Sequence, residues 1–316
     1  MKRKTQFIAL FVAGLVAFAP HAFPQNENQG EGTAIITVLP KNAKASAPDI
    51  AQQAIHVEVN GKQSQITNWQ PLHGTRSPVE VVLLIDDGAR LSLGSEMNDI
   101  RQFIQSLSPN VKFSIAYMEN GRAALAGPLT TNHQNALQEL RLPLGVSGQS
   151  ASPYFCLSDL AKNWPSNDRS ARREVIMITD GVDYYHIHYD PEDPYVQSAI
   201  QDAVHAHLLV SSIYWRNSGR FDRSWYANDE GQNLLMEVTS ATGGDSYWIG
   251  MGNPVSLSPY FDDFNRRLKN QYELAFSAPL RGRPEMANLK VKVQARDVKV
   301  TAPQNTWVGP AAMAHE

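Results

Sequence analysis

The chain has 316 residues, 42% of them hydrophobic, and a formal net charge of -3 at pH 7. This length allows one sizeable hydrophobic core and a smaller module, and the acidic balance argues against nucleic acid or anionic lipid as the main partner. The single cysteine, Cys156, excludes an intramolecular disulfide, so stability must come from packing.

Residues 1–22 have the order of a secretory signal peptide. Lys2, Arg3 and Lys4 precede an apolar stretch at residues 7–18, and small residues follow it. The stretch is shorter than the roughly 20 apolar residues of a membrane span, although a short membrane anchor is the alternative. We expect an exported protein, periplasmic or extracellular, with no stable membrane span after signal removal. Loss of the three basic residues would make the net charge -6.

The N-terminal region of the mature chain has a β pattern. A polar lead-in at residues 23–32 is expected to be disordered. An N-terminal β segment follows at residues 33–78, with strand candidates at 33–39, 54–59 and 65–69. Between the last two stands Asn60-Gly61, a dipeptide that strongly favours a hairpin turn.

Residues 79–270 alternate between strand and helix patterns. Two apolar runs, 79–86 and 174–180, end in Asp86 and Asp180, and such runs without alternation predict strands buried on both faces. Other strand candidates are 111–118, 123–129, 208–215 and 246–249, and helix candidates are 97–107, 157–164, 195–207, 232–241 and 260–270. This order predicts an α/β fold with a doubly wound, mostly parallel sheet.

Residues 271–308 return to the alternating pattern of half-exposed antiparallel strands, at 271–276, 289–294 and 298–301. We expect this C-terminal β segment to form one small β module with the N-terminal β segment. Residues 309–316 are expected to be an unstructured tail.

Residues 79–270 resemble a von Willebrand factor type A (vWA) domain. Residues 81–86 (VVLLID) resemble its first strand and residues 175–181 (VIMITDG) its fourth. The mature chain is similar to the VWFA-related proteins common in Acidobacteria, which carry phrases like residues 57–66 (VEVNGKQSQI) and residues 268–274 (LKNQYEL). The resemblance implies a vWA-like fold, but neither an activity nor a partner.

The resemblance also implies a place for a divalent cation. Most vWA domains hold one at a metal-ion-dependent adhesion site built from Asp-x-Ser-x-Ser, a distant Thr and a distant Asp. Asp86 matches the first Asp and Asp180 the last, whereas Gly88 and Arg90 stand at the two serine positions. Ser150 or Ser152 could supply the hydroxyl of the threonine, so the site is degenerate.

These departures leave three interpretations of the site. Mg²⁺ or another divalent cation could be held by Asp86, Asp180, Ser150 and Ser152, with water in place of the lost hydroxyls. Arg90, which has donors and no acceptor, could instead pair with both aspartates. In the third interpretation the site is a hydrated relic. Asp87 could restore one ligand.

The segment after the second run, residues 180–195, contains five carboxylates, two histidines and four tyrosines. His186 and His188 would share one face of a strand and could bind a metal, but their spacing matches no zinc motif. The alternative is a surface loop in which Asp193-Pro194 begins the next helix. The tyrosines favour protein contact.

Sequence features of enzymes are incomplete. Asp86 and Asp87 are adjacent, unlike the Asp-x-Asp motif of haloacid-dehalogenase-type phosphatases. Residues 148–152 (GQSAS) lack the final glycine of the Gly-x-Ser-x-Gly motif that carries the nucleophile of serine hydrolases. Cys156 sits in a helix pattern as a small core residue. We expect no enzymatic activity, with a metal-dependent hydrolase as the least favoured alternative.

The sequence therefore predicts an exported, non-enzymatic module of the adhesion or scaffold type that binds a protein through the carboxyl edge of its sheet, without a metal or other cofactor. A divalent-metal-dependent adhesion module using Asp86 and Asp180 is the alternative. The identity of the protein partner is not predicted. Partner-binding candidates come from the loops at this edge: Asp87, Arg90, Asp183, His186, His188, Tyr189, Arg220 and Trp225.

Overall fold

The computed structural model describes residues 28–42, 45, 49–72, 77–146, 148–186, 190, 192–217, 225–248, 252–280 and 282–310. The expected signal peptide, residues 1–22, lies outside the described residues. None of the helices in the described ranges is both long enough and apolar enough to cross a membrane.

One half of the molecule is a six-stranded sheet in the order β6-β5-β4-β7-β8-β9. Five strands run parallel, and β6 is an antiparallel edge. The bounds are β4 Val79–Asp86, β5 Val111–Glu119, β6 Arg122–Leu125, β7 Arg172–Thr179, β8 Leu208–Tyr214 and β9 Ser246–Tyr247. Every residue of β4 and β8 is buried, which explains their continuous apolar patterns.

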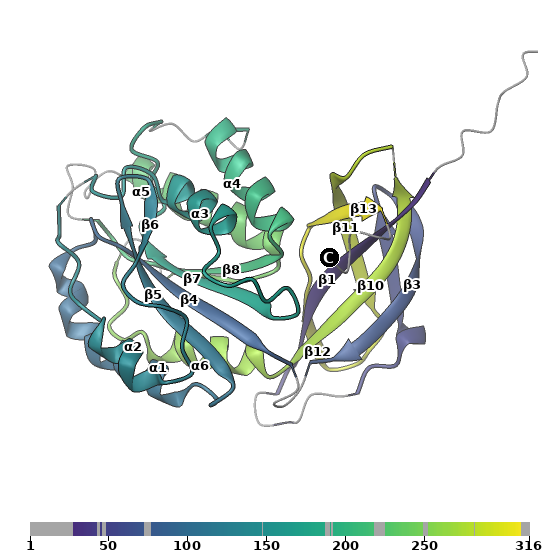
Figure 1. Cartoon of the computed structure of the whole chain (residues 1–316), viewed down its shortest axis with the longest axis horizontal. Coiled ribbons are helices and arrows are strands. Elements are labelled where there is room, and N and C mark those ends of the chain that lie inside the picture. Colours follow the sequence, from purple (N-terminus) through teal and green to yellow (C-terminus); the bar gives the residue numbers. More distant parts are fainter. Residues whose placement is uncertain are drawn as a thin grey trace, which may run out of the picture.

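Helices cover both faces of this sheet (Figure 1). On one face pack α1 (Met97–Ser106), α2 (His133–Gln138) and α6 (Ser258–Leu268), with the 3-10 turn η2 (Leu91–Glu96) ahead of α1. On the other face pack α3 (Pro153–Lys162), α4 (Pro194–His205) and α5 (Trp225–Thr242). The predicted α/β fold is confirmed.

The other half is an antiparallel β barrel made from both ends of the chain. Pairing of β1 with β10 closes the ring β10-β3-β2-β11-β13-β1, and β12 pairs with β1 outside it. The bounds are β1 Asn28–Pro40, β2 Ile55–Val59, β3 Lys62–Pro71, β10 Gln271–Leu280, β11 Glu285–Val293, β12 Val298–Thr301 and β13 Asn305–Pro310, with the turn η1 (Gln52–Ala54) before β2. Asn60 and Gly61 form the β2–β3 turn, both with positive φ.

Several elements differ from the sequence-based expectations, among them helix α2, which was not predicted, and three strands. Strand β1 begins at Asn28, inside the stretch expected to be disordered, because Gly30 and Gly32 let it lie close to β13 and Phe276. Strand β13 continues to Pro310, into the expected tail, because it pairs with β11 and β1. The strand expected at 123–129 is the short antiparallel β6, since Asn120 and Gly121 turn the chain back on β5.

The barrel packs at the amino ends of the parallel strands (Figure 1). Arg172, at the start of β7, donates hydrogen bonds to the Leu268 carbonyl and to the Gln271 side chain. The Gln271 side chain in turn donates a hydrogen bond of 2.7 Å to the buried Glu174. Trp307 of β13 lies against His205 of α4, with 4.4 Å between ring centroids. The carboxyl ends of the strands therefore lie on the side away from this interface.

Candidate functional site

Asp86 and Asp180 stand at the carboxyl ends of the neighbouring strands β4 and β7. Their side chains are 1% and 4% exposed. The Asp86 carboxylate accepts hydrogen bonds from the Gly88 N–H (2.8 Å) and the Thr179 hydroxyl (2.8 Å). The Asp180 carboxylate accepts from the Val182 N–H (3.0 Å) and the Tyr184 hydroxyl (3.1 Å). Parallel pairing of the two strands brings the residues together.

The two carboxyl groups disfavour each other's charge. Burial raises the pKa of Asp86 to about 6, against the lowering effect of its hydrogen bonds. Burial, followed by the charge of Asp86, raises the pKa of Asp180 to about 8. Because they interact, they titrate as a pair. Near neutral pH the pair therefore holds a proton more readily than two free carboxylates would.

Of the two candidate hydroxyls, only that of Ser150 belongs to this site. It is fully buried and close enough to Asp86 to lower the pKa of that carboxyl, yet it has no partner at hydrogen-bond geometry among the residues that the structure describes. Ser152 instead caps α3, where its hydroxyl accepts from the Tyr154 N–H at 3.3 Å. Ser152 is therefore committed to the start of the helix.

Asn217 is a site residue that the sequence analysis missed. Its carboxamide donates weakly to Asp86 (3.5 Å), and its backbone N–H bonds to Asp180. A Cβ built on Gly88 would lie 2.7 Å from Asn217 Nδ2. The amide thus fills the space where the first serine of the adhesion motif would place its side chain. Its sequence signal is a polar residue shortly after the buried strand β8, next to β7.

Arg90 does not replace a cation, which corrects the ion-pair interpretation. Its Nε donates to the Asn217 carbonyl at 3.3 Å, and its backbone N–H donates to the Arg216 carbonyl at 3.2 Å. Although all three residues are described, no ion pair joins Arg90 to Asp86 or Asp180. The turn after β4 directs Arg90 to the backbone that follows β8.

The residues present do not fit the octahedral cation that the vWA resemblance implies. Two carboxylates and the Ser150 hydroxyl could serve as oxygen ligands. However, Gly88 and Arg90 supply no side-chain oxygen at the two serine positions, and the Asn217 amide occupies the space beside Gly88. Within the described ranges, no group of three His, Cys, Asp or Glu residues could hold a metal ion.

Asp87, a candidate for partner contact, is a buried anchor. Its side chain is fully buried and forms a bidentate ion pair with Arg141, with N···O distances of 2.6 and 2.9 Å. The carboxylate also accepts from the Leu144 N–H (2.9 Å), and the Asp87 carbonyl accepts from the Gly145 N–H (3.0 Å). The Arg141 guanidinium lies 3.7 Å from the centre of the Tyr117 ring. Asp87 therefore fixes the 141–146 loop and cannot itself touch a partner.

This loop and η2 present an exposed apolar surface, which we call the leucine patch. Its members are each between 46% and 59% exposed: Leu91, Leu142, Leu144 and Val146. The two segments lie close together, since a Cβ on Gly145 would be 2.9 Å from the Leu91 side chain and one on Gly94 would be 3.2 Å from that of Leu142. The patch lies beside Gly88, because the Val146 carbonyl is 3.0 Å from a Cβ built there.

The loop after β7 contains both buried and exposed candidates. Asp183 is 1% exposed, so it too cannot contact a partner directly. His186 is half-exposed and pairs with Asp193 at 2.5 Å, while Asp193 caps α4 through the Tyr195 N–H at 2.8 Å. Trp225 begins α5 and is 75% exposed. The remaining candidates, His188, Tyr189 and Arg220, lie outside the described residues.

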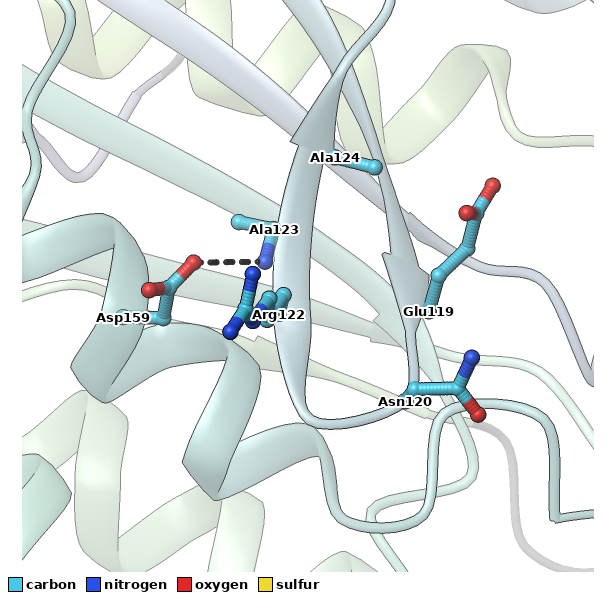
Figure 2. Close-up of a pocket in the computed structure, with 6 residues that line it drawn as sticks. All are labelled: Glu119, Asn120, Arg122, Ala123, Ala124 and Asp159. Carbon is cyan, nitrogen blue, oxygen red and sulfur yellow. Dashed lines mark hydrogen bonds between the residues drawn. The ribbon is translucent and has the colours of Figure 1, made fainter.

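An open pocket of about 710 Å³ lies elsewhere, at the β5–β6 hairpin. In Figure 2, Asp159 approaches one side of β6 and Glu119 points away on the other. Asp159 accepts from the Ala123 N–H at 3.0 Å, which joins α3 to the hairpin. Cys156 is fully buried, and burial raises the pKa of its thiol well above the usual range. The pocket lining does not include Asp86 or Asp180. Cys156 lies next to their site, because its thiol donates to the Ser150 carbonyl at 3.6 Å and the charge of Asp86 adds to its raised pKa.

No protein-family profile matches the chain, and no curated protein matches it in sequence. Solved structures do resemble it. An aerotolerance-related membrane protein from Bacteroides fragilis has a TM-score of 0.45 and 13% identity, covering 60% of this chain and 98% of its own. BatB from Bacteroides thetaiotaomicron has a TM-score of 0.44 and 16% identity, covering 60% and 97%.

The ArnB paralog VWA2 from Sulfolobus acidocaldarius has a TM-score of 0.41 and 9% identity, covering 88% of this chain and 76% of its own. At these TM-scores and identities, the likenesses assign no function to this chain.

Proposed function

We propose that residues 79–270 are a vWA-like domain and that the protein is an exported, non-enzymatic module of the adhesion or scaffold type. It binds a protein partner through the carboxyl edge of its sheet without a metal. The placement of Asp86 and Asp180 on neighbouring parallel strands supports the vWA-like assignment. The short signal-like segment at residues 1–22 supports export.

The leucine patch is the observation that carries the protein-binding proposal. Four exposed apolar side chains gather on two loops at the edge where ligands of parallel sheets bind. Asp87 and Arg141 hold one of these loops in place, so little conformational entropy would be lost on binding. Exposed apolar patches on a fixed loop pair are typical of protein contact surfaces.

Independence from metal is supported by Asn217. Its amide fills the space beside Gly88 and contributes a donor to Asp86. A metal-dependent adhesion module remains the second candidate, because Ser150 brings an unpartnered buried hydroxyl to two carboxyl groups with raised pKa values. In that case Mg²⁺ or Mn²⁺ would raise the thermal stability of the protein.

A binding experiment tests the protein-contact surface. The purified mature protein is used to capture partners from the exported proteins of its source cells, and recovery is compared with that of Leu144→Glu. The matched control is Val255→Glu, because Val255 is 94% exposed and lies outside the patch. We expect partners that bind wild type and the control but are lost with Leu144→Glu. Equal recovery by all three proteins would refute the assignment of this surface.

A second experiment decides between the metal-free and metal-dependent forms. Mg²⁺, Mn²⁺ and Ca²⁺ are titrated into wild type and Arg90→Ser by calorimetry, and thermal unfolding is followed with and without chelator. The metal-free proposal predicts no stoichiometric binding and no effect of chelator on wild type. Micromolar binding that disappears in Asp180→Asn would establish the metal-dependent alternative.

A further inference from the structure

Three aromatic rings meet at the same edge of the sheet, on the side of α3 and α4. Phe155, in the first turn of α3, contacts Tyr185 of the loop after β7 and Tyr195 of the first turn of α4. The ring centroids are 5.2 and 4.8 Å apart, respectively. Tyr185 is 65% exposed and Tyr195 44% exposed. Both tyrosines thus present ring surface to solvent while Phe155 holds them in place.

Acidic side chains accompany these rings. The partly exposed Asp190 and the exposed Glu192 lie on the segment between the two tyrosines, where the Asp190 carboxylate accepts from the Glu192 N–H at 2.9 Å. We call Phe155, Tyr185, Asp190, Glu192 and Tyr195 the acidic aromatic face. The sequence contains no Lys or Arg between Arg173 and Arg216. Within the described part of the chain, no Lys or Arg pairs with either carboxylate.

Two further acidic residues are buried next to this face, and one of them, Asp183, accepts from the Tyr185 N–H at 2.8 Å. Asp183 and Glu230 are each 1% exposed, and among the described residues neither Asp183 Oδ2 nor either oxygen of Glu230 has a hydrogen-bond partner. Burial, then the charge of Asp183, raises the pKa of Glu230 to about 7, whereas His186 opposes the shift. Unpartnered buried acceptors of this kind are rare in folded proteins. A cation bound at this face would favour the charged forms of both groups.

We propose that the acidic aromatic face binds a segment of the partner rich in lysine or arginine. Cationic side chains would lie over the Tyr185 and Tyr195 rings and pair with Asp190 and Glu192. An acidic segment would be repelled, and an apolar one would leave the carboxylates without partners. The inference rests on the proposed protein-binding function and assigns the basic part of the partner to a surface separate from the leucine patch.

The test uses fluorescence anisotropy with a labelled peptide of alternating arginine and glycine. Peptides of equal length with glutamine or glutamate in place of arginine serve as probes of charge. We expect the arginine peptide to bind wild type, the glutamine and glutamate peptides to bind much more weakly, and added salt to weaken binding. Equal binding of the glutamine peptide would overturn the proposal.

Variants test the site itself. Tyr185→Ser and Tyr195→Ser should each weaken arginine-peptide binding about two- to fivefold, the loss expected for one cation–π contact at an exposed site. Trp248→Ser is the matched control, because Trp248 is 45% exposed and follows β9. Thermal unfolding verifies that each variant is folded. Unchanged affinity in both tyrosine variants, or an equal loss in the control, would place the peptide elsewhere and overturn the proposal.

Two further measurements separate this inference from other outcomes. Leu144→Glu should still bind the arginine peptide, so loss of partner capture with retained peptide binding distinguishes the two surfaces. Ca²⁺ and Mg²⁺ should compete only as general salt does. If either ion binds stoichiometrically and that binding is lost in Glu230→Gln, the carboxylates form a metal site and the peptide proposal fails.

Discussion

The Asn217 carboxamide occupies the space that any side chain at position 88 would need. A Cβ on Gly88 would lie 2.7 Å from Nδ2 and 3.1 Å from Oδ1 of Asn217. The same amide donates to Asp86 across a sequence separation of 131 residues. Gly88 and Asn217 therefore form one packed unit at the site. The effects of substituting the two residues on the free energy of unfolding should be coupled.

Gly88→Ser should lower the free energy of unfolding by about 1–3 kcal/mol, the usual cost of forcing an extra side chain into packed space. Asn217→Ala added to Gly88→Ser should recover part of this loss, because it opens the space. Urea unfolding of both single variants and the double variant measures the coupling. Gly252→Ser is the control, since no atom lies within 4 Å of a Cβ there. If the losses in free energy of unfolding from the two site substitutions simply add, the proposed packing of Gly88 against Asn217 is wrong.

Arg141→Ala should lower the free energy of unfolding by about 2–4 kcal/mol, because it leaves the fully buried Asp87 carboxylate without its counter-charge. The expected loss lies below that of a fully buried pair, since the Arg141 side chain is 39% exposed. Arg141→Lys should recover only part, because lysine cannot form both bonds. Arg122→Ala, at an exposed position of the β5–β6 hairpin, is the denaturation control. A loss as small as that of the control would show that Asp87 needs no partner.

Asp180→Asn should become more stable relative to wild type as pH rises. The pKa of Asp180 is raised to about 8 in the folded protein, above the usual 3.8, so the folded state binds more protons between those values. The stability from this group is present at low pH and is lost as pH rises towards 8. We expect a relative gain of at least ~1 kcal/mol between about pH 5 and pH 9, measured by urea unfolding. Asp262→Asn, on the exposed side of α6, should show no such trend. A constant difference would contradict the shift.

Gly231→Ala should destabilise the protein although alanine favours helices by about 1 kcal/mol. Helix α5 crosses the loop after β7 so closely that a Cβ on Gly231 would lie 2.1 Å from the Asp180 carbonyl oxygen. We expect a net loss of about 2 kcal/mol or more, with Gly252→Ala as the control. Thermal unfolding of both variants provides the measurement. A Gly231→Ala protein as stable as wild type would mean that α5 moves away at little cost.

Local patterns were sufficient for the main elements of the α/β half. The apolar runs ending at Asp86 and Asp180 are buried on both faces, and this alone predicts parallel strands with their ends at one edge. Asn60 and Gly61 likewise specify a turn by their own backbone preferences. Strand β13 was not predicted, because Gly309 and Pro310 have low strand propensity. The strand forms by pairing with β11 and β1.

The sequence by itself determined the fold class and the edge at which Asp86 and Asp180 meet. Short apolar runs of residues are enough to indicate which strands are buried and in which direction they run. Only the tertiary structure decided what surrounds the two aspartates. Arg141 reaches Asp87, and Asn217 fills the space beside Gly88, because the paths of separate loops bring these residues together. Loop paths depend on packing across the whole domain, which no local pattern encodes.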